Sequence, residues 1–161
     1  MIRLIPMNQE DYTSWRENAV REYAEDHIRD GRWSPDNALQ ESDKEFSQLL
    51  PNDLETKDNY LFSLQEETAD QKVGYLWFAV IGPERKQYAF VYDFLIFEAF
   101  RRRGYGTQSF KALETKIREL GLDSIGLHVF GHNYAARELY KRLGYSETNV
   151  SMRKDLKDIV D

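Results

Sequence analysis

The stretch Arg101-Arg102-Arg103-Gly104-Tyr105-Gly106 decides how the rest of the chain is interpreted. An almost entirely apolar run, residues 88–97, precedes it, and a run with helical spacing, residues 107–120, follows it. Glycines permit a tight turn and a close approach of the backbone to a ligand. A helix start presents free N–H groups and the positive end of the helix dipole. Because no Ser, Thr, Asp or Asn caps these groups just before Tyr105, the sequence predicts a phosphate site at this turn.

The composition indicates a globular chain and excludes several functions. Of 161 residues, 41% are hydrophobic and 31% charged, an ordinary balance for one folded domain. A net charge of −6 leaves no basic surplus, so we expect no nucleic-acid partner. The absence of cysteine excludes disulfides and thiolate nucleophiles. The first residues are too short for a signal-peptide core, and no apolar run approaches the ~20 residues of a membrane span. We therefore expect a cytoplasmic protein without a membrane partner.

Hydrophobic patterning predicts the order of helices and strands. Two helices follow a short first strand; the first ends at Gly31 and the second begins at Ser34-Pro35. Consecutive strands in the middle of the chain favour hairpins, whereas the later strand–helix–strand unit favours a parallel pair. The predicted strands are residues 2–5, 59–65, 72–81, 88–97, 124–130 and 145–152, and the predicted helices are about residues 11–30, 34–50, 107–120 and 133–143.

Two motifs in this order resemble those of the GCN5-related N-acetyltransferases (GNAT), a family of acetyl-CoA-dependent enzymes. Residues 101–106 match the family's Gln/Arg-x-x-Gly-x-Gly/Ala motif, and a second signature consists of Asn133, Ala136, Tyr140 and Gly144-Tyr145. Each motif alone is weak, since short glycine motifs recur by chance, but both occur here in the family's structural order. The resemblance covers about residues 73–152 and points to a bacterial branch of uncharacterised members.

The resemblance implies an α/β fold (α+β by some schemes): one mixed, mostly antiparallel twisted sheet of six or seven strands flanked by four helices. It implies a single N-acetyltransferase domain over residues 1–161. Residues 1–58 would form the first strand and the acceptor-side helices. Residues 59–161 would form the acetyl-CoA-binding core and the C-terminal strands.

The resemblance also implies how acetyl-CoA, the acetyl donor, would be held. Backbone N–H groups near the glycine turn would bind its pyrophosphate, and the strand that includes Ile96 would lie along the pantetheine arm. The simpler alternatives are a plain turn, a plain buried strand and, for Asn133, an ordinary helix N-cap. No metal is expected. The implied cofactor-binding residues are Phe94, Leu95, Ile96, Arg101, Arg102, Arg103, Gly104, Tyr105, Gly106, Thr107, Asn133 and Ala136.

Tyr140 and His128 are the candidate catalytic residues. In the family a tyrosine at the position of Tyr140 protonates the leaving thiolate, and a phenol is protonated at neutral pH. The alternative for Tyr140 is a core aromatic. A histidine at position 128 could accept the proton of the amine, whereas the alternative is a buried, hydrogen-bonded side chain. Asp93, the only carboxylate inside its strand, needs a bonding partner because unpaired burial is costly.

The acceptor implied by the family is the amine of a small molecule or peptide. The acceptor side is expected to be the first two helices together with Tyr75 and Trp77. Glu22, Glu25 and Asp26, an acidic stretch near Tyr23 and Trp33, could attract an ammonium group, although a solvated helix face also explains these charges. Direct attack is expected, since no cysteine can carry an acyl group.

Two other functions compete with acetyl transfer to an amine. One is a non-catalytic acyl-CoA sensor on the same fold. The other is dinucleotide binding, but Ser109 stands where that fingerprint requires Gly or Ala. A homodimer is compatible with the resemblance, and the sequence leaves the acceptor open.

Overall fold

The computed structural model describes residues 1–157; residues 158–161, the end of the predicted domain, lie outside the described residues. The strands are β1 (Ile2–Pro6), β2 (Asn59–Glu66), β3 (Gln71–Ile81), β4 (Tyr88–Ile96) and β5 (Ile125–Leu127). The α-helices are α1 (Gln9–Asp30), α2 (Ala38–Leu49), α3 (Tyr105–Glu119) and α4 (Tyr134–Arg142), with short 3₁₀ turns at Asp53–Glu55 and Glu98–Phe100.

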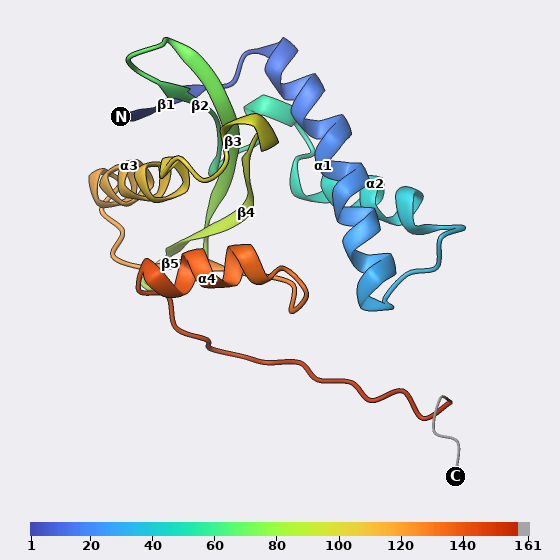
Figure 1. The fold of residues 1–161 in the computed structure, drawn as a ribbon. Helices are drawn as coiled ribbons and strands as arrows, with labels where there is room; N and C mark the ends of the chain where they lie inside the picture. Colours follow the sequence, from blue (N-terminus) through green and yellow to red (C-terminus); the bar gives the residue numbers. More distant parts are fainter. Residues whose placement is uncertain (158–161) are drawn as a thin grey trace.

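One mixed sheet in the order β1-β2-β3-β4-β5 organises the fold (Figure 1). The pairs from β1 to β4 are antiparallel, and β4 and β5 are parallel, as the strand–helix–strand unit predicted. The prediction of six or seven strands is wrong, because within residues 1–157 the sheet has five. Residues 145–152 pair with no strand. Alternation of side chains indicates a strand conformation, but a strand also needs a neighbour for its backbone hydrogen bonds.

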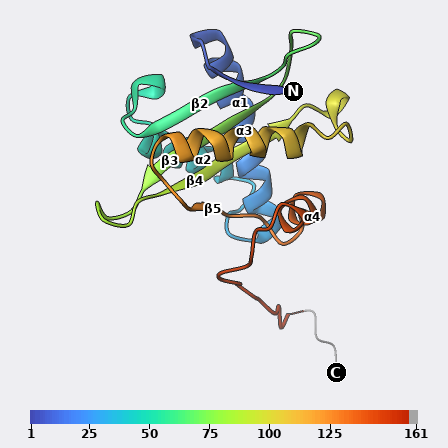
Figure 2. The same ribbon diagram turned by 90° about the vertical axis from the view of Figure 1, so that its left-hand side faces the viewer.

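The helices cover both faces of the sheet. Helices α1 and α2 lie on one face and α3 on the other (Figure 2). Along β3, Tyr75 and Trp77 pack toward α1 and α2, while Leu76 and Phe78 pack toward α3. Alternate side chains of a strand point to opposite faces, so β3 is buried on both, and its almost continuous apolar run has this physical reason.

The ends of α1 follow its sequence signals, but the start of α2 does not. Asn8 Oδ1 accepts the N–H of Asp11 at 2.8 Å, and Gly31 ends α1 with a φ of +83°. Ser34-Pro35 was predicted to begin the second helix, yet these residues form a turn and α2 starts at Ala38. The Ser34 hydroxyl donates to Asn37 Oδ1 at 3.1 Å instead of capping a helix.

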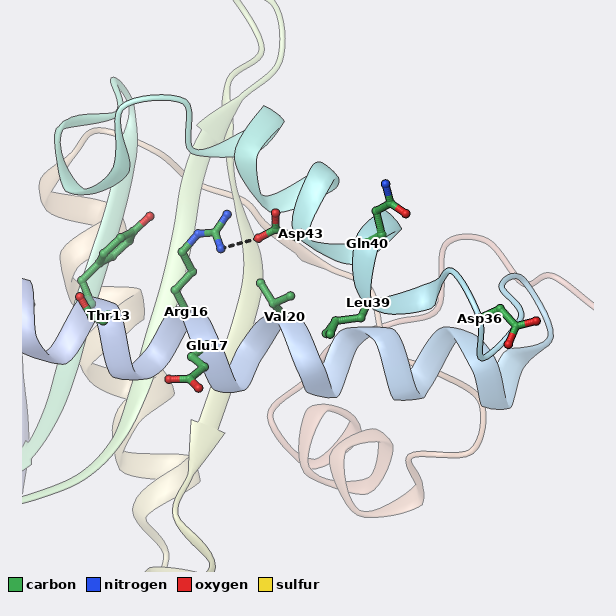
Figure 3. A pocket seen from close by; sticks show the side chains of 9 residues that line it. Thr13, Arg16, Glu17, Val20, Asp36, Leu39, Gln40 and Asp43 are labelled. Atoms are coloured by element: carbon green, nitrogen blue, oxygen red, sulfur yellow. Dashed lines mark hydrogen bonds and ion pairs between the residues drawn. The ribbon is translucent and has the colours of Figure 1, made fainter.

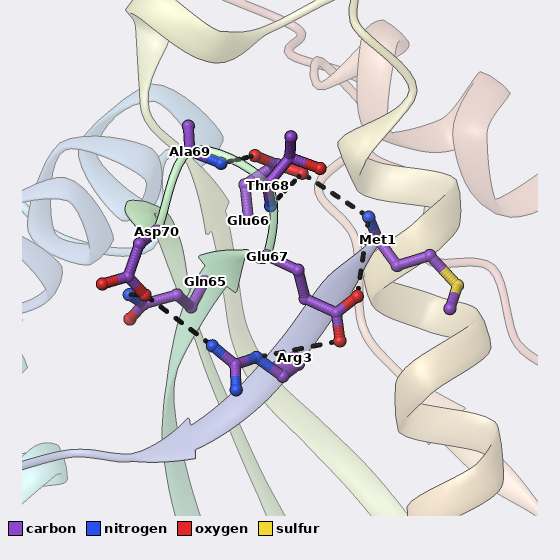
Figure 4. Close-up of polar contacts among 8 residues, drawn as sticks. All are labelled: Met1, Arg3, Gln65, Glu66, Glu67, Thr68, Ala69 and Asp70. Atoms are coloured by element: carbon purple, nitrogen blue, oxygen red, sulfur yellow. Dashed lines mark hydrogen bonds and ion pairs between the residues drawn. The ribbon is translucent and has the colours of Figure 1, made fainter.

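The edge of the sheet farthest from β5 is fixed by polar contacts around the β2–β3 hairpin (Figure 4). Glu66 accepts the backbone N–H groups of Thr68 at 3.1 Å and Ala69 at 2.7 Å, which tightens the turn and lowers the pKa of its carboxyl. The amino group of Met1 lies 3.5 Å from Glu66 Oε1, so the first residue of the chain is anchored to the hairpin.

Candidate active site

A pocket of about 350 Å³ lies where α1, α2, β4, the segment after β5 and α4 meet. Its lining combines aromatic side chains with a few polar groups, which is typical of a ligand site. Among the described residues this pocket brings together the two predicted catalytic residues, Tyr140 and His128, with Phe94, Asn133 and Ala136 from the predicted cofactor set. Leu95, Ile96 and residues 101–107 do not line it.

The pocket opens where β4 and β5 separate. The two strands pair only over Ala89–Val91 and Ile125–Leu127, so β4 has no strand beside its outer edge from Tyr92 onward. A bulge leaves Tyr92 without a partner on β3, and bulges bend a strand. The Phe97 N–H donates to Val73 O at 2.8 Å, toward β3. Because N–H directions alternate along a strand, the Ile96 N–H faces the open edge.

Beyond the open edge, the arginine–glycine turn begins α3. Gly104 is the N-cap with a φ of +80° and has no side chain to cap the first turn, as the sequence predicted. Arg102 also has a positive φ, of +62°. Arg101 Nε donates to Ile96 O at 2.9 Å, and the Arg103 guanidinium lies 5.6 Å from the Phe100 ring centroid. Two of the three arginine side chains therefore have structural contacts of their own.

Gly106 has a packing role that the sequence did not reveal. A Cβ built on Gly106 would lie 3.1 Å from Leu139 Cδ2, tighter than most real contacts. Gly106 therefore lets α4 approach the first turn of α3. This approach brings the helix that carries Tyr140 close to the glycine turn.

Helix α4 positions Tyr140 at the pocket. Asn133 Oδ1 accepts the Ala136 N–H at 3.2 Å, so Asn133 is the helix N-cap. The Tyr140 ring packs edge-on against Phe110, with centroids 5.5 Å apart. Burial, with a contribution from the Asp93 carboxylate, raises the pKa of Tyr140 to about 12. The phenol is therefore protonated at neutral pH, as a general acid must be.

Asp93 has the bonding partner that its position in a strand required. Its Oδ2 accepts the indole N–H of Trp15 at 2.8 Å, a contact between residues 78 positions apart. Burial raises the pKa of Asp93 to about 6, and the Glu22 carboxylate adds to this effect. Asp93 lines the same pocket as Tyr140 and is mostly ionised at neutral pH.

His128 is exposed, directly follows β5 and lines the pocket. This overturns the alternative of a buried, hydrogen-bonded histidine, and the hydrogen bonds among residues 1–157 include none to its ring. Its ring packs edge-on against Phe130 at 5.2 Å. His27 and His132 pack against the same phenylalanine at 5.0 and 5.3 Å.

The acidic residues of α1 divide between the pocket and solvent. Glu22 and Asp26 line the pocket, joined by Glu45 from α2, whereas Glu25 does not line it. Burial and the nearby Asp26 and Glu25 carboxylates raise the pKa of Glu22. Asp26 Oδ1 lies 2.9 Å from His132 Nε2. The pocket is thus bordered by carboxylates on its α1 side.

Sequence reasoning missed two features of this site: the bond from Trp15, which does not itself line the pocket, to Asp93, and the Glu45 side chain, which does line it. A helical wheel could have found Trp15, because it lies seven residues before Glu22 on the same helix face. Tyr75 and Trp77 were both expected on the acceptor side and both pack toward α1 and α2, but of the two only Trp77 lines the pocket.

A second hollow, of about 720 Å³, lies between α1 and α2 (Figure 3). Arg16 and Asp43 form an ion pair of 2.8 Å across it, and Val20 and Leu39 point into it. It contains no residue of either sequence motif, so its size does not make it the candidate site.

Comparison with known proteins identifies the family to which this fold belongs. The model of the acetyltransferase (GNAT) family matches residues 12–145. The chain belongs to this family, which generally uses acetyl-CoA.

Relatives place the chain beside bacterial members of the family. It is 39% identical to the uncharacterised N-acetyltransferase YycN of Bacillus subtilis (strain 168), over 96% of this chain and 99% of the relative. It is 31% identical to the uncharacterised N-acetyltransferase YdgE of the same organism, over 93% and 95% of the two chains. These relatives confirm the predicted bacterial branch.

Solved structures agree with the fold. The crystal structure of YycN superimposes with a TM-score of 0.92 and covers 97% of this chain and 99% of that one. An aminoglycoside acetyltransferase, meta-AAC0020 from an uncultured soil metagenomic sample, matches with a TM-score of 0.60 over 96% of both chains. Its identity of 16% shows a shared fold alone.

None of the helices within residues 1–157 has the length and apolar character needed to cross a bilayer. The described part of the chain also gathers no group of three or more His, Asp or Glu side chains that could hold a metal ion.

Proposed function

We propose that this protein transfers the acetyl group of acetyl-CoA to a primary amine by direct attack. The observation that carries the proposal is the meeting of Tyr140, His128 and Asp93 in one pocket at the open edge of β4. A proton donor, an exposed imidazole and a carboxylate in one cleft suit a reaction that moves protons on both sides of an acyl transfer.

Acetyl-CoA fits the residues at the open edge. The first turn of α3, capped only by Gly104, has N–H groups suited to a pyrophosphate, and the free edge of β4 suits the amide groups of pantetheine. When bound, acetyl-CoA supplies a thioester whose acyl carbon is activated toward amines. The residues that would hold it are Phe94, Leu95, Ile96, Arg101, Arg102, Arg103, Gly104, Tyr105, Gly106, Thr107, Asn133 and Ala136.

Each catalytic residue then has one task. His128 accepts a proton from the acceptor's ammonium group, which frees the nitrogen lone pair for attack. The Ile96 N–H stabilises the negative charge that develops on the carbonyl oxygen. Tyr140 donates its proton to the departing sulfur. No acyl-enzyme on cysteine forms, because the chain has no cysteine.

The acceptor enters from the α1 side of the pocket. Glu22 and Asp26 attract a cationic amine, and the Tyr23 and Trp77 rings offer faces against which it can pack. Ionised Asp93 adds to the negative potential near Tyr140. Residues 1–58, joined by Trp77 of β3, thus supply the acceptor side of the pocket, and the donor side comes from the rest of residues 59–161.

A panel of amines tests this function. Purified protein is incubated with acetyl-CoA and, in turn, with polyamines, amino sugars, amino acids and peptide amines, and release of free thiol is followed. We expect at least one amine to raise thiol release far above the rate with acetyl-CoA alone. Calorimetry with acetyl-CoA and with NAD runs in parallel. Acetyl-CoA binding without turnover on any amine would favour the sensor, and NAD binding alone would refute the proposal.

A further inference from the structure

The chain after α4 forms an arm, residues 146–157, that leaves the body of the molecule (Figures 1 and 2). Tyr145 still packs on the folded domain: its N–H donates to Tyr140 O at 3.0 Å, and the centroids of its ring and the Phe110 ring lie 5.9 Å apart. Within the described residues, no backbone–backbone hydrogen bond ties the arm to the rest of the chain. The arm is therefore an extended segment whose backbone groups lack partners within the chain described.

The arm carries the pattern of a half-buried strand. Thr148, Val150 and Met152 alternate with polar residues, so its β-formers and apolar residues share one face. Val150 is 61% exposed and Met152 is 92% exposed. An alternating strand normally places its apolar face on a core and its polar face in water. The face of Val150 and Met152 has no such cover here.

In the described sheet, the β5 strand has an unpaired edge that could receive such a strand. Ala89 N–H on β4 donates to Ser124 O at 3.0 Å. Because backbone groups alternate, those of Ile125 and Leu127 face away from β4, toward the side where the described sheet ends. An open edge of this kind accepts an added strand. Between Gly121 and Lys157 every residue is at least partly exposed, including Ile125 and Leu127 of β5.

The arm is held away from its own β5. Glu147 pairs with Arg137 of α4 at 3.6 Å, and Arg153 Nη1 donates to Asp30 O at the end of α1, at 2.7 Å. These contacts lead the arm past α4 toward α1 instead of along β5. A second copy of the chain offers at once both partners that are missing within residues 1–157: an open β5 edge for the arm and an unpaired arm for the β5 edge.

We propose that two copies of this chain exchange arms, so that residues 148–152 of each copy add a strand to the β5 edge of the other. The exchange is isologous, since each copy gives and receives the same element, and it closes as a two-fold dimer. It covers Val150 and Met152 and satisfies the outward backbone groups of Ile125 and Leu127. The proposal is independent of the acetyl-transfer chemistry.

The test measures the mass of the full chain in solution by light scattering during gel filtration. The wild type should have twice the chain mass of 19.1 kDa. The double variant Val150→Asp with Met152→Asp places two charges on the apolar face of the arm and should halve the measured mass. The matched control, Asn149→Asp with Ser151→Asp, adds the same two charges to the opposite face and should remain a dimer.

Circular dichroism of all three proteins checks that each is folded, which the exposure of the arm leads us to expect. A monomeric wild type would overturn the proposal, since the arm would then pair with its own chain or with nothing. A dimer that survives the Val150→Asp and Met152→Asp changes would also overturn it, since another surface would hold the copies together. Equal dissociation of both double variants would contradict the assigned face.

Discussion

Tyr140 and Asp93 illustrate how one pocket sets two protonation states. Burial raises the pKa of both groups, to about 12 for the phenol and about 6 for the carboxyl. At neutral pH the phenol stays protonated and the carboxyl is mostly ionised. The ionised carboxylate in turn helps to raise the pKa of the phenol. A neutral donor beside a fixed negative charge suits protonation of a leaving thiolate next to an incoming cation.

Replacing Tyr140 with Phe should lower kcat about 100-fold, because a positioned general acid contributes roughly 10²–10⁴-fold to a rate. The affinity for acetyl-CoA, measured by calorimetry, should stay nearly the same, since the ring and its packing on Phe110 remain. Tyr134→Phe is the matched control: Tyr134 lies on the same helix, is 72% exposed and does not line the pocket. An unchanged kcat in Tyr140→Phe would remove the proposed acid.

Asp93 should make stability depend on pH. Its pKa is raised in the folded state from an ordinary value of 3.8 to about 6, so between these values the folded protein binds the extra proton. Stability from this group is therefore present at about pH 4 and is lost as the pH rises through about 6. The loss is on the order of 2 to 3 kcal/mol.

Urea denaturation of wild type and Asp93→Asn at several pH values tests this dependence. The amide still accepts the Trp15 N–H but does not titrate, so the difference in unfolding free energy between the two proteins isolates Asp93. We expect Asp93→Asn to be the more stable protein above about pH 6, with the advantage shrinking toward about pH 4. A difference that is constant with pH would show that Asp93 titrates normally.

At the scale of single elements, α3 contains its own control for the proposed phosphate site. Gly104 begins the helix with a φ of +80°, and Gly121 follows its end with a φ of +78°. An added Cβ would meet only Gln108 Nε2, at 4.0 Å, at Gly104 and nothing within 4 Å at Gly121. The two glycines therefore share backbone conformation and free space but lie at opposite ends of the helix.

Gly104→Ala and Gly121→Ala should each destabilise the protein by about 1 kcal/mol, the usual penalty for a left-handed alanine. Only Gly104→Ala should also weaken acetyl-CoA binding, on the order of tenfold, because its methyl group occupies the space in front of the first turn. Chemical denaturation and calorimetry give the two quantities. Equal acetyl-CoA affinities for the two variants would place the pyrophosphate elsewhere.

How far sequence predicts elements depends on whether the signal is local. The end of α1 at Gly31 and the strand β3 were predicted because a helix-ending glycine and an apolar run leave direct traces in the sequence. The strand at 145–152 was not formed, although its alternation is clear, because pairing depends on a neighbour that local sequence does not specify. The helix start predicted at Ser34-Pro35 was wrong because the Ser34 hydroxyl donates to Asn37 Oδ1 and does not cap a helix.

At the scale of the whole molecule, β3 lies between two hydrophobic cores and contributes side chains to both. The core under α3 includes Leu76 and Phe78, and the core under α1 and α2 includes Trp15 and Trp77. Disturbing the backbone of β3 should therefore affect both faces together. Gly74 is the most sensitive position, since an added Cβ would lie 1.9 Å from the Leu95 carbonyl oxygen of β4.

Gly74→Ala should reduce the free energy of unfolding by about 3 kcal/mol or more, because the strands must separate to admit a methyl group. Gly131→Ala is the matched control: nothing lies within 4 Å of its added Cβ, and we expect a change within about 0.5 kcal/mol. Thermal unfolding followed by circular dichroism compares the two. A tolerated Gly74→Ala would mean that β3 and β4 can shift without loss of packing.

The candidate site was only partly predictable at this scale. Tyr140, Asn133 and the glycine turn belong to motifs, so the sequence located them together. The contact between Trp15 and Asp93 joins residues 78 positions apart, and it exists only because α1 crosses the face of β4. Gly106 was predicted for its closeness to a ligand, whereas its structural contact is with Leu139 of another helix.

The indole of Trp15 makes the pocket optically readable. Trp15 is 1% exposed and donates its N–H to Asp93. The ring centroids of Trp15 and Trp77 lie 5.5 Å apart, so the fluorescence of two of the three tryptophans should respond to the charge of Asp93. Gain of a proton by Asp93 removes a negative charge beside the indole and should shift the fluorescence emission with a midpoint near 6. An amine that reaches Asp93 should move that midpoint downward. The protein thus contains an intrinsic fluorophore with which candidate acceptors can be ranked without any label.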